Sequence, residues 1–256
     1  MSDAPLADRL RPAQLGDIIG QDHLVGPDGA ITRMVATGRL PSLLLWGPPG
    51  CGKTSIARLL AEAAGMRFMA LSAVFSGVAD LKKAFAEARD LRRLGDRVLL
   101  FVDEIHRFNR SQQDAFLPVV EDGTVTLVGA TTENPSFELN AALLSRMQVQ
   151  LLRPLDAEAL ESLLSRAETL QGRALPLDAD ARATLIAGAD GDGRYLLNQA
   201  ELLWSNFALQ WAVDLPRLFA EWNRVLRVGG LAMFTAPGPD TLRELRAALH
   251  QCGLDV

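Results

Sequence analysis

This chain of 256 residues contains little cysteine and no apolar run long enough to cross a bilayer. Its two cysteines, Cys51 and Cys252, lie far apart and outside any Cys-x-x-Cys pattern, which argues against a zinc site or a disulfide framework. A membrane helix needs about 18 or more consecutive apolar residues. The start, MSDAPLADRLRP, has neither an apolar core nor an Arg- and Ser-rich character. We therefore expect a cytoplasmic protein without a membrane anchor.

An excess of positive charge is also missing, because 26 Lys and Arg face 31 Asp and Glu, for a net charge of −5. The molecule as a whole therefore repels phosphate, and any contact with nucleic acid needs a local basic patch. The best candidate is a group of six arginines: Arg89, Arg92, Arg93, Arg97, Arg107 and Arg110. Acidic residues alternate with these arginines, so the group equally fits the solvated face of a helix.

Short apolar runs alternate with segments of helical periodicity over the first 150 residues. The pattern predicts strands at 43–46, 67–71, 98–102, 124–130 and 148–152. It predicts helices at 29–37, 52–64, 77–94, 111–120 and 139–145. Such alternation is typical of a doubly wound α/β fold with a five-stranded parallel sheet. We assign residues 1–154 to a nucleotide-binding α/β domain.

After Arg153 and Pro154 the pattern changes to helices alone, at 157–170, 178–187 and 194–203. We interpret residues 155–203 as a small helical lid. With 48% hydrophobic residues, the chain can bury one sizeable core together with a smaller satellite domain.

The octapeptide GPPGCGKT, from Gly47 to Thr54, directly follows the strand predicted at 43–46. A strand that ends in Gly-x-x-x-x-Gly-Lys-Thr and enters a helix directs several backbone N–H groups into one concavity, where polyphosphate binds. Lys53 would reach the phosphates, and the hydroxyl of Thr54 would ligate Mg²⁺. The loop residues expected to contact ATP are Gly47, Pro48, Pro49, Gly50, Cys51, Gly52, Lys53, Thr54 and Ser55. The alternative is a glycine-rich turn that merely joins two elements.

Two carboxylates, Asp103 and Glu104, close the strand predicted at 98–102. They would lie at the carboxyl edge of the sheet, where ligands of such folds bind. We expect Asp103 to hold Mg²⁺ and Glu104 to polarise the attacking water. Taken alone, an Asp-Glu pair is as often a solvated turn or a helix cap. His106 could act as a base, but its place at the start of a helix is also a common structural one.

Four segments together resemble one family. RLRPAQLGDIIGQDHLVG, LLLWGPPGCGKTSIARLLA, LLFVDEIHRFNRSQQDAFLPVVEDG and LVGATTENPSFELNAALLSR are similar to the replication-associated recombination protein A (RarA, or MgsA) family of AAA+ ATPases. The likeness spans residues 4–203. DEIHRFN followed by QQDAFLP, together with ATTENPSFE, distinguishes this family from AAA+ proteins at large.

The resemblance implies roles that spacing alone does not give. Thr131 matches sensor 1, with Asn134 as a second choice. Arg146 matches the arginine finger that is offered to a neighbouring subunit, and Arg194 matches sensor 2 in the lid. Ile18, Ile19 and Gly20 match the segment that packs on adenine. The family also implies an oligomeric, nucleoid-associated ATPase acting on single-stranded, gapped or forked DNA together with single-stranded-DNA-binding protein.

Residues 204–256 depart from that family, whose lid leads into a further helical domain used for assembly. They resemble the C-terminal part of a class I methyltransferase of the BioC type, with RVLRVGG, LAMFTA and GPDTLRELR in succession. This segment lacks the glycine-rich cofactor loop and the acidic ribose-binding residue, so we expect no methyl transfer. Alternatively, it is a helical extension of the lid. Loss of the assembly domain predicts tight ATP binding with slow hydrolysis.

Two alternatives to a RarA-type ATPase remain. One is a motor like RuvB or a clamp-loader subunit, which the DEIHRFN segment disfavours. The other is a nucleotide-bound scaffold that holds a protein partner without DNA. Stimulation of ATP hydrolysis by DNA distinguishes the scaffold from the DNA-dependent ATPases.

Overall fold

The computed structural model describes residues 5–175, 177–206, 216–217, 220 and 231–235. The chain divides into two compact units. One unit comprises residues 7–197, and the other combines residues 1–6 with residues 198–256. In the part of the chain that the structure describes, no helix has the length and apolar character needed to span a membrane.

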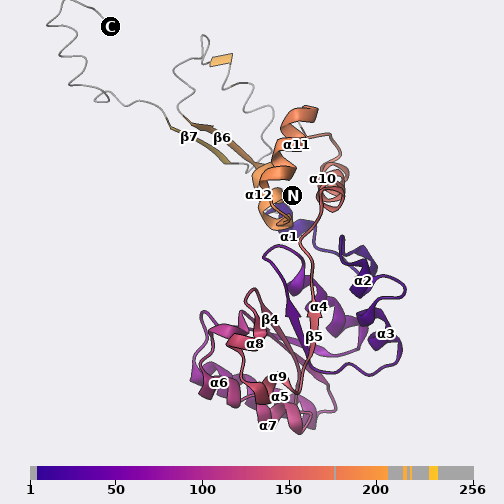
Figure 1. The fold of residues 1–256 in the computed structure, drawn as a ribbon, viewed down its shortest axis with the longest axis vertical. Coiled ribbons are helices and arrows are strands. Elements are labelled where there is room, and N and C mark those ends of the chain that lie inside the picture. The colour runs from indigo at the N-terminus through magenta and orange to yellow at the C-terminus, as the bar shows by residue number, and fades with distance from the viewer. Residues whose placement is uncertain (1–4, 176, 207–215, 218–219, 221–230, 236–256) are drawn as a thin grey trace, which may run out of the picture. The chain divides into compact units, whose positions relative to one another are not determined.

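The larger unit contains a five-stranded parallel sheet (Figure 1). Its strands are β1 (Leu43–Trp46), β2 (Arg67–Ser72), β3 (Val98–Asp103), β4 (Thr126–Thr131) and β5 (Gln148–Leu151). Their order across the sheet is β2-β3-β4-β1-β5. The predicted doubly wound parallel sheet is therefore confirmed.

Helices and single turns connect the strands. Those before and within the sheet are α1 (Leu6–Arg9), η1 (Leu15–Asp17), α2 (Asp22–Val25), α3 (Ala30–Ala36), α4 (Lys53–Ala63), α5 (Val78–Arg93), η2 (Ile105–Arg107), α6 (Arg110–Asp114), α7 (Leu117–Glu121), α8 (Pro135–Glu138) and α9 (Ala141–Leu144). The long helices α4 and α5 agree with the predicted ones. The short elements α1, η1, α2 and η2 were not predicted, because one turn shows no periodicity.

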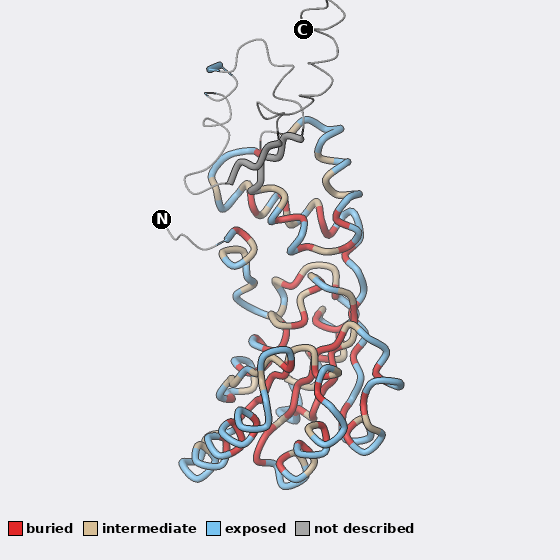
Figure 2. Tube along the Cα trace, turned by 90° about the vertical axis from the view of Figure 1, so that its left-hand side faces the viewer, coloured by how far each residue is buried: buried red, intermediate tan, exposed pale blue. Residues whose placement is uncertain are grey.

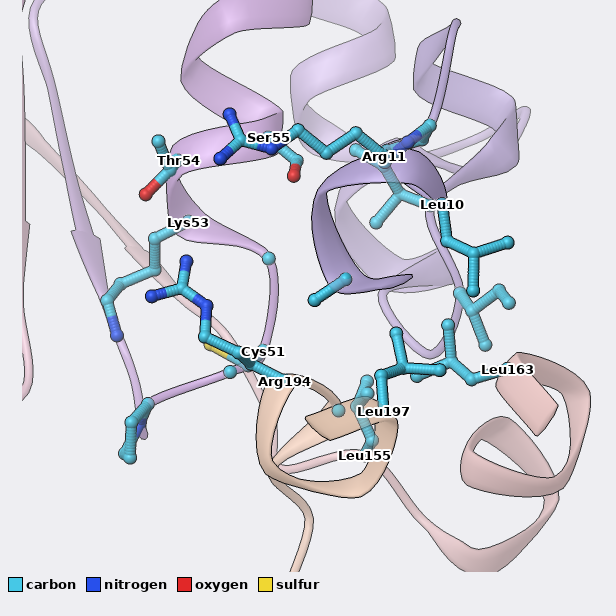
Figure 3. Close-up of a pocket in the computed structure, with 18 of the residues that line it drawn as sticks. Leu10, Arg11, Cys51, Lys53, Thr54, Ser55, Leu155, Leu163, Arg194 and Leu197 are labelled. Carbon is cyan, nitrogen blue, oxygen red and sulfur yellow. The ribbon is translucent and has the colours of Figure 1, made fainter. Parts of the chain in front are cut away.

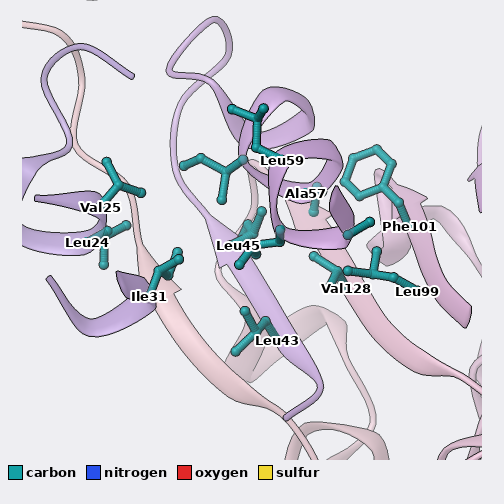
Figure 4. Close-up of a cluster of buried hydrophobic side chains, with 14 of the residues drawn as sticks. Leu24, Val25, Ile31, Leu43, Leu45, Ala57, Leu59, Leu99, Phe101 and Val128 are labelled. Carbon is teal, nitrogen blue, oxygen red and sulfur yellow. The ribbon is translucent and has the colours of Figure 1, made fainter. Parts of the chain in front are cut away.

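Alternate residues of each strand face opposite sides of the sheet, and each side has its own apolar core. On one side Leu43 and Leu45 of β1 pack with Ile56 and Leu60 of α4 (Figure 4 shows the cluster). On the other side Leu44 packs in a separate cluster that includes residues of α5 and α7. The central strands β1, β3 and β4 are almost entirely buried, whereas the edge strands β2 and β5 are mostly half-buried or exposed. Figure 2 shows the buried stretches inside the larger unit. Because side chains cover both faces of the sheet, a ligand can reach the sheet only at its edges.

The single helix predicted at 111–120 is wrong, because two short helices, α6 and α7, occupy this region. Pro118 lies at the start of α7, where its missing N–H costs no intrahelical hydrogen bond. In a continuous helix the proline ring would instead meet the carbonyl of Asp114. The helix predicted at 139–145 is shorter than expected, since α9 is capped by the Asn140 side chain.

The helices predicted from residue 157 onward are present as α10 (Ala157–Gln171), α11 (Ala179–Gly188) and α12 (Gly193–Glu201), and their assignment to a lid stays a prediction. Arg182 of α11 makes ion pairs with Glu161 and Glu168 of α10, at 2.6 and 2.8 Å. Hydrogen bonds from this guanidinium hold the pKa of each carboxylate below its ordinary value. The pair of helices is therefore held together in part by charge, a contribution that requires ionised glutamates.

In the smaller unit, β6 (Leu202–Asn206) and β7 (Leu231–Thr235) form a two-stranded parallel sheet. The predicted lid helix to Leu203 is wrong at its end, because α12 stops at Glu201 and a strand follows. The strand predicted in LAMFTA is present as β7. The rest of the methyltransferase-like succession lies outside the described residues, and the assignment of 204–256 stays a prediction.

Candidate functional site

The carboxyl ends of the central strands place polar residues along one edge of the sheet. Trp46 pairs in register with Thr131, and the N–H of Gly47 donates to the Thr131 carbonyl oxygen at 3.2 Å. On the next strand, Asp103 is the last residue of β3. The phosphate-loop sequence therefore begins beside β4, which carries Thr131, and one strand away from β3, at the sheet edge where ligand sites of open α/β folds lie.

The loop from Gly47 to Gly52 turns back on itself before α4 begins. Gly50 and Gly52 have φ values of +67° and +100°, which side chains with a Cβ rarely adopt. The ammonium group of Lys53 donates to the carbonyl oxygens of Gly47 and Pro48, each at 2.7 Å, and the residue is buried. The loop thus folds around the lysine, and its positive charge lies inside the curve of the backbone.

Cys51 closes the same turn, since its Sγ–H donates to the Pro48 carbonyl oxygen at 3.0 Å. Burial raises the pKa of this thiol. A protonated, buried thiol is a poor nucleophile and a poor metal ligand. The interpretation of Cys51 as an ordinary thiol agrees with this environment, while Cys252 lies outside the described residues.

A cavity lies over the loop and is lined by residues from four parts of the larger unit (Figure 3). The phosphate loop and α4 contribute residues 49–55, and the end of β3 with the residue after it contributes Asp103 and Glu104. The segment before β1 contributes Ile18 and Ile19, and the lid contributes Arg194. Most of the predicted site residues therefore line one space.

The cavity has an apolar side and a polar side. Leu155, Leu163 and Leu197 gather at one side, and Lys53 and Thr54 lie at the other (Figure 3). Sites for small molecules commonly combine an apolar wall with a few oriented polar groups. A molecule with a flat apolar base and a polyanionic tail matches this division.

Four of the lining residues carry positive charge: Arg11, Lys53, Arg166 and Arg194. Arg11 also pairs with Asp8, which is exposed to the same cavity. Clustered cations in a concave site attract anions such as phosphate. The sequence did not predict four of these lining residues: Arg11, Leu155, Leu163 and Leu197. They lie far from the phosphate-loop motif in sequence, and only the fold brings them to the cavity.

The lid touches the phosphate loop directly at Gly50. A methyl group added to Gly50 would come within 1.8 Å of Asp192 Oδ1. Asp192 also accepts a hydrogen bond from the Tyr195 N–H at 2.9 Å, at the start of α12. A glycine is therefore required at residue 50 for two reasons, its positive φ and the approach of the lid carboxylate.

Replacing Gly50 with alanine is expected to destabilise the protein more than replacing Gly38. Gly38 has φ +66° and no atom within 4 Å of an added Cβ, so Gly38→Ala introduces the backbone strain alone, about 1 kcal/mol. Gly50→Ala adds the clash with Asp192. Thermal unfolding and nucleotide affinity would be measured for both variants. Equal losses in the two proteins would contradict the contact between lid and loop.

Several predicted residues do not line the cavity. Thr131 is fully buried behind it, and its hydroxyl lies 2.9 Å from Nδ1 of His106. Asn134, the second choice for sensor 1, instead caps α8 by accepting from the Ser136 N–H. Arg146 is exposed and pairs with Glu121, and also donates to the Ala142 carbonyl oxygen.

The remaining predicted residues lie beside the cavity. Gly47 and Pro48 face Lys53 through their carbonyl oxygens. Gly20 has φ +76° and packs against Leu155. None of these three residues lines the cavity.

Ion pairs with acidic residues neutralise part of the arginine group that was considered for binding nucleic acid. Arg92 pairs with Asp122 at 3.5 Å, and Arg93 pairs with Asp90 at 2.9 Å, all of them exposed. These contacts favour the alternative of a solvated helix face for α5.

Among the described residues, no group of three or more His, Cys, Asp or Glu side chains is arranged to hold a metal ion. Mg²⁺ is seldom bound by an all-protein cage and usually takes one or two protein oxygens together with phosphate and water. The Thr54 hydroxyl and the Asp103 carboxylate line the same cavity and fit that description.

Comparisons with known proteins agree with this architecture. Residues 43–155 match the profile of the ATPase family associated with various cellular activities (AAA). The chain is 47% identical to replication-associated recombination protein A of Escherichia coli K12 over 204 residues, 78% of this chain and 46% of that protein. It is 45% identical to ATPase WRNIP1 of Dictyostelium discoideum over 205 residues, 78% of this chain and 23% of that protein.

Among solved structures, the chain resembles the RuvB Holliday junction branch migration motor of Thermotoga maritima. The TM-score is 0.63 with 25% identity, over 96% of this chain and 76% of that one. A mutant of the same protein gives 0.64 with 24% identity, over 96% and 77%. The predicted AAA+ P-loop fold is thereby confirmed, and the RarA and WRNIP1 proteins are homologues consistent with ATP hydrolysis. The chain spans about half the length, 46%, of the RarA relative from Escherichia coli.

Proposed function

We propose that this protein binds ATP with Mg²⁺ in the cavity over the phosphate loop and hydrolyses it in response to DNA. The observation that carries the proposal is the convergence of Lys53, Asp103 and Arg194 on one cavity from three separate elements. Polyphosphate hydrolysis needs little more from a protein than charge stabilisation, a metal site and an oriented water.

Each lining group has a role that follows from its chemistry. Lys53 and the N–H groups of residues 50–54 bind the phosphates, while Thr54 and Asp103 hold Mg²⁺, which would neutralise phosphate charge. Glu104 orients the attacking water. Arg194 adds positive charge from the lid, and the apolar side formed with Ile18 and Ile19 accommodates adenine.

Thr131 and Arg146 act from outside the cavity. Thr131 supports the water-binding side of the site as sensor 1. Arg146 is exposed and lies at the end of a short helix, which suits a finger offered to the nucleotide of a second copy in a homo-oligomer. An arginine supplied in this way typically raises turnover by about 10³ to 10⁵.

The DNA-dependent part of the proposal draws on the relatives named replication-associated recombination protein A. We propose single-stranded, gapped or forked DNA as the activating ligand and single-stranded-DNA-binding protein as a partner. With a net charge of −5, contact with DNA must use a local surface.

A steady-state ATPase assay with and without DNA tests this function. Magnesium-dependent hydrolysis by the full chain should increase several-fold on adding single-stranded or forked DNA at low salt, and should decline as salt rises. ATP hydrolysis that is indifferent to every DNA structure would instead favour the nucleotide-bound scaffold. Absence of ATP binding by calorimetry would refute both.

A further inference from the structure

The side chains of Glu104, which lines the cavity, and of Thr131, which does not, meet at one nitrogen atom of His106. Nδ1 of His106 lies 2.9 Å from Thr131 Oγ1 and 3.3 Å from Glu104 Oε2. The His106 side chain is only 6% exposed, and the residue does not line the cavity. This position outside the cavity lining disfavours a direct role for His106 as a base.

The partners of Thr131 determine where the imidazole hydrogen lies. The Thr131 hydroxyl accepts from the Glu133 N–H at 3.1 Å and can donate its one hydrogen to the Glu133 carbonyl oxygen at 3.3 Å. Its second lone pair is then free to accept from Nδ1–H of His106. The threonine hydroxyl is fully satisfied only if Nδ1 is a donor.

The carboxylate of Glu104 leads to the same assignment. An Nδ1 that carried a lone pair would face a carboxylate oxygen at 3.3 Å, so that two acceptors would oppose each other. If Nδ1 carries a hydrogen, the contact becomes attractive, because the N–H can donate to both the Glu104 carboxylate and the Thr131 hydroxyl. The hydroxyl of Thr132 approaches the same Glu104 oxygen at 3.5 Å.

The backbone of Glu104 shows why such support is needed. Its φ of 52° and ψ of 45° place it in the left-handed region, which residues with a Cβ adopt at a cost. This conformation persists only where surrounding contacts hold it. The first turn after β3 brings His106 back beneath Glu104, so the histidine supplies one of those contacts.

We propose that His106 is a positioning residue whose Nδ1–H holds Glu104 and Thr131 in a fixed mutual arrangement. The proposal rests on the function proposed above only for its kinetic consequence. The hydrogen-bond arrangement itself belongs to the protein without ligands and can be tested there.

Nitrogen-15 NMR of the three histidines tests the arrangement directly in the full chain without nucleotide. Spectra at about pH 8 should show His106 with its hydrogen on Nδ1. His23 provides an internal control, because its Nε2 lies 2.9 Å from the Leu151 carbonyl oxygen and must be the protonated nitrogen. His106→Leu and His250→Gln assign the signals. A neutral His106 with its hydrogen on Nε2 would overturn the proposal.

Kinetics of two substitutions separate positioning from simple structural support. Asparagine places an amide N–H where Nδ1 stands, whereas leucine fills the space without a donor. His106→Leu should lower kcat about 10- to 100-fold with little change in KM, and His106→Asn should recover most of the loss. If both variants lost kcat equally and their melting temperatures fell equally, the role of His106 would be packing alone.

The two experiments test the hydrogen-bond arrangement and the proposed function independently of each other. If the chain proves unable to hydrolyse ATP, the function proposed above is wrong, while the NMR result still decides the arrangement of His106. If ATP is hydrolysed and His106→Leu keeps kcat within two-fold, the positioning role is refuted and the proposed function stands.

Discussion

Replacing Lys53 with methionine is expected to weaken ATP binding by at least about 100-fold, as follows from losing charge-assisted hydrogen bonds to phosphate. Methionine keeps the length and apolar stem of the side chain but not its positive charge. In the protein without ligand, Lys53 is buried and bound to the carbonyl oxygens of Gly47 and Pro48. The ammonium group therefore already lies inside the loop that would surround the phosphates.

Calorimetric titration with ATP and Mg²⁺ measures this effect. Lys82→Met is the matched control, because Lys82 is an exposed lysine on α5 and should leave the affinity unchanged. Melting temperatures should show that both variants fold. An ATP affinity of Lys53→Met within three-fold of the wild type would show that the loop is a structural turn.

Replacing Glu104 with glutamine is expected to lower kcat by about 10² to 10³ while leaving ATP affinity within a few-fold. The amide keeps the size of the side chain but has no negative charge to polarise water. It can still accept the hydrogen from His106, so the fold around residue 104 should be preserved. The expected signature is therefore stable ATP binding with little turnover.

Single-turnover hydrolysis, compared with binding of ATP by the same variant, separates the two steps. Glu87→Gln is the control, since Glu87 is exposed on α5 and away from the cavity. If Glu104→Gln retained more than about a third of wild-type kcat, a different group would have to orient the water. Asp103→Asn is expected to differ by losing magnesium dependence as well.

Much of the sheet could be predicted from the sequence because its signals are local. Each strand is a short apolar run, and Gly47 to Thr54 has a conformation fixed by its own glycines. The edge position of Asp103 follows once β3 is recognised as parallel. These inferences need only neighbours within a few residues, which explains their agreement with the structure.

Long-range contacts could not be predicted in this way. No pattern in the sequence joins Gly50 to Asp192, which are brought together only when the lid packs on the loop. Likewise, Arg11 and Leu197 reach the cavity from opposite ends of the larger unit. The break between α6 and α7 was missed because apolar periodicity continues through Pro118, although its ring disfavours a continuous helix.

The ion pair between Arg146 and Glu121 gives the proposed finger a resting partner in its own chain. Both side chains are exposed, and pairs of this kind stabilise by about 1 kcal/mol or less. An anion of a neighbouring copy would therefore displace Glu121 at little cost in free energy. The Arg146 guanidinium would exchange one oxygen partner for another without passing through an unpaired state. The affinity between copies would then depend only weakly on Arg146, whereas the rate of ATP hydrolysis after assembly would depend on it strongly.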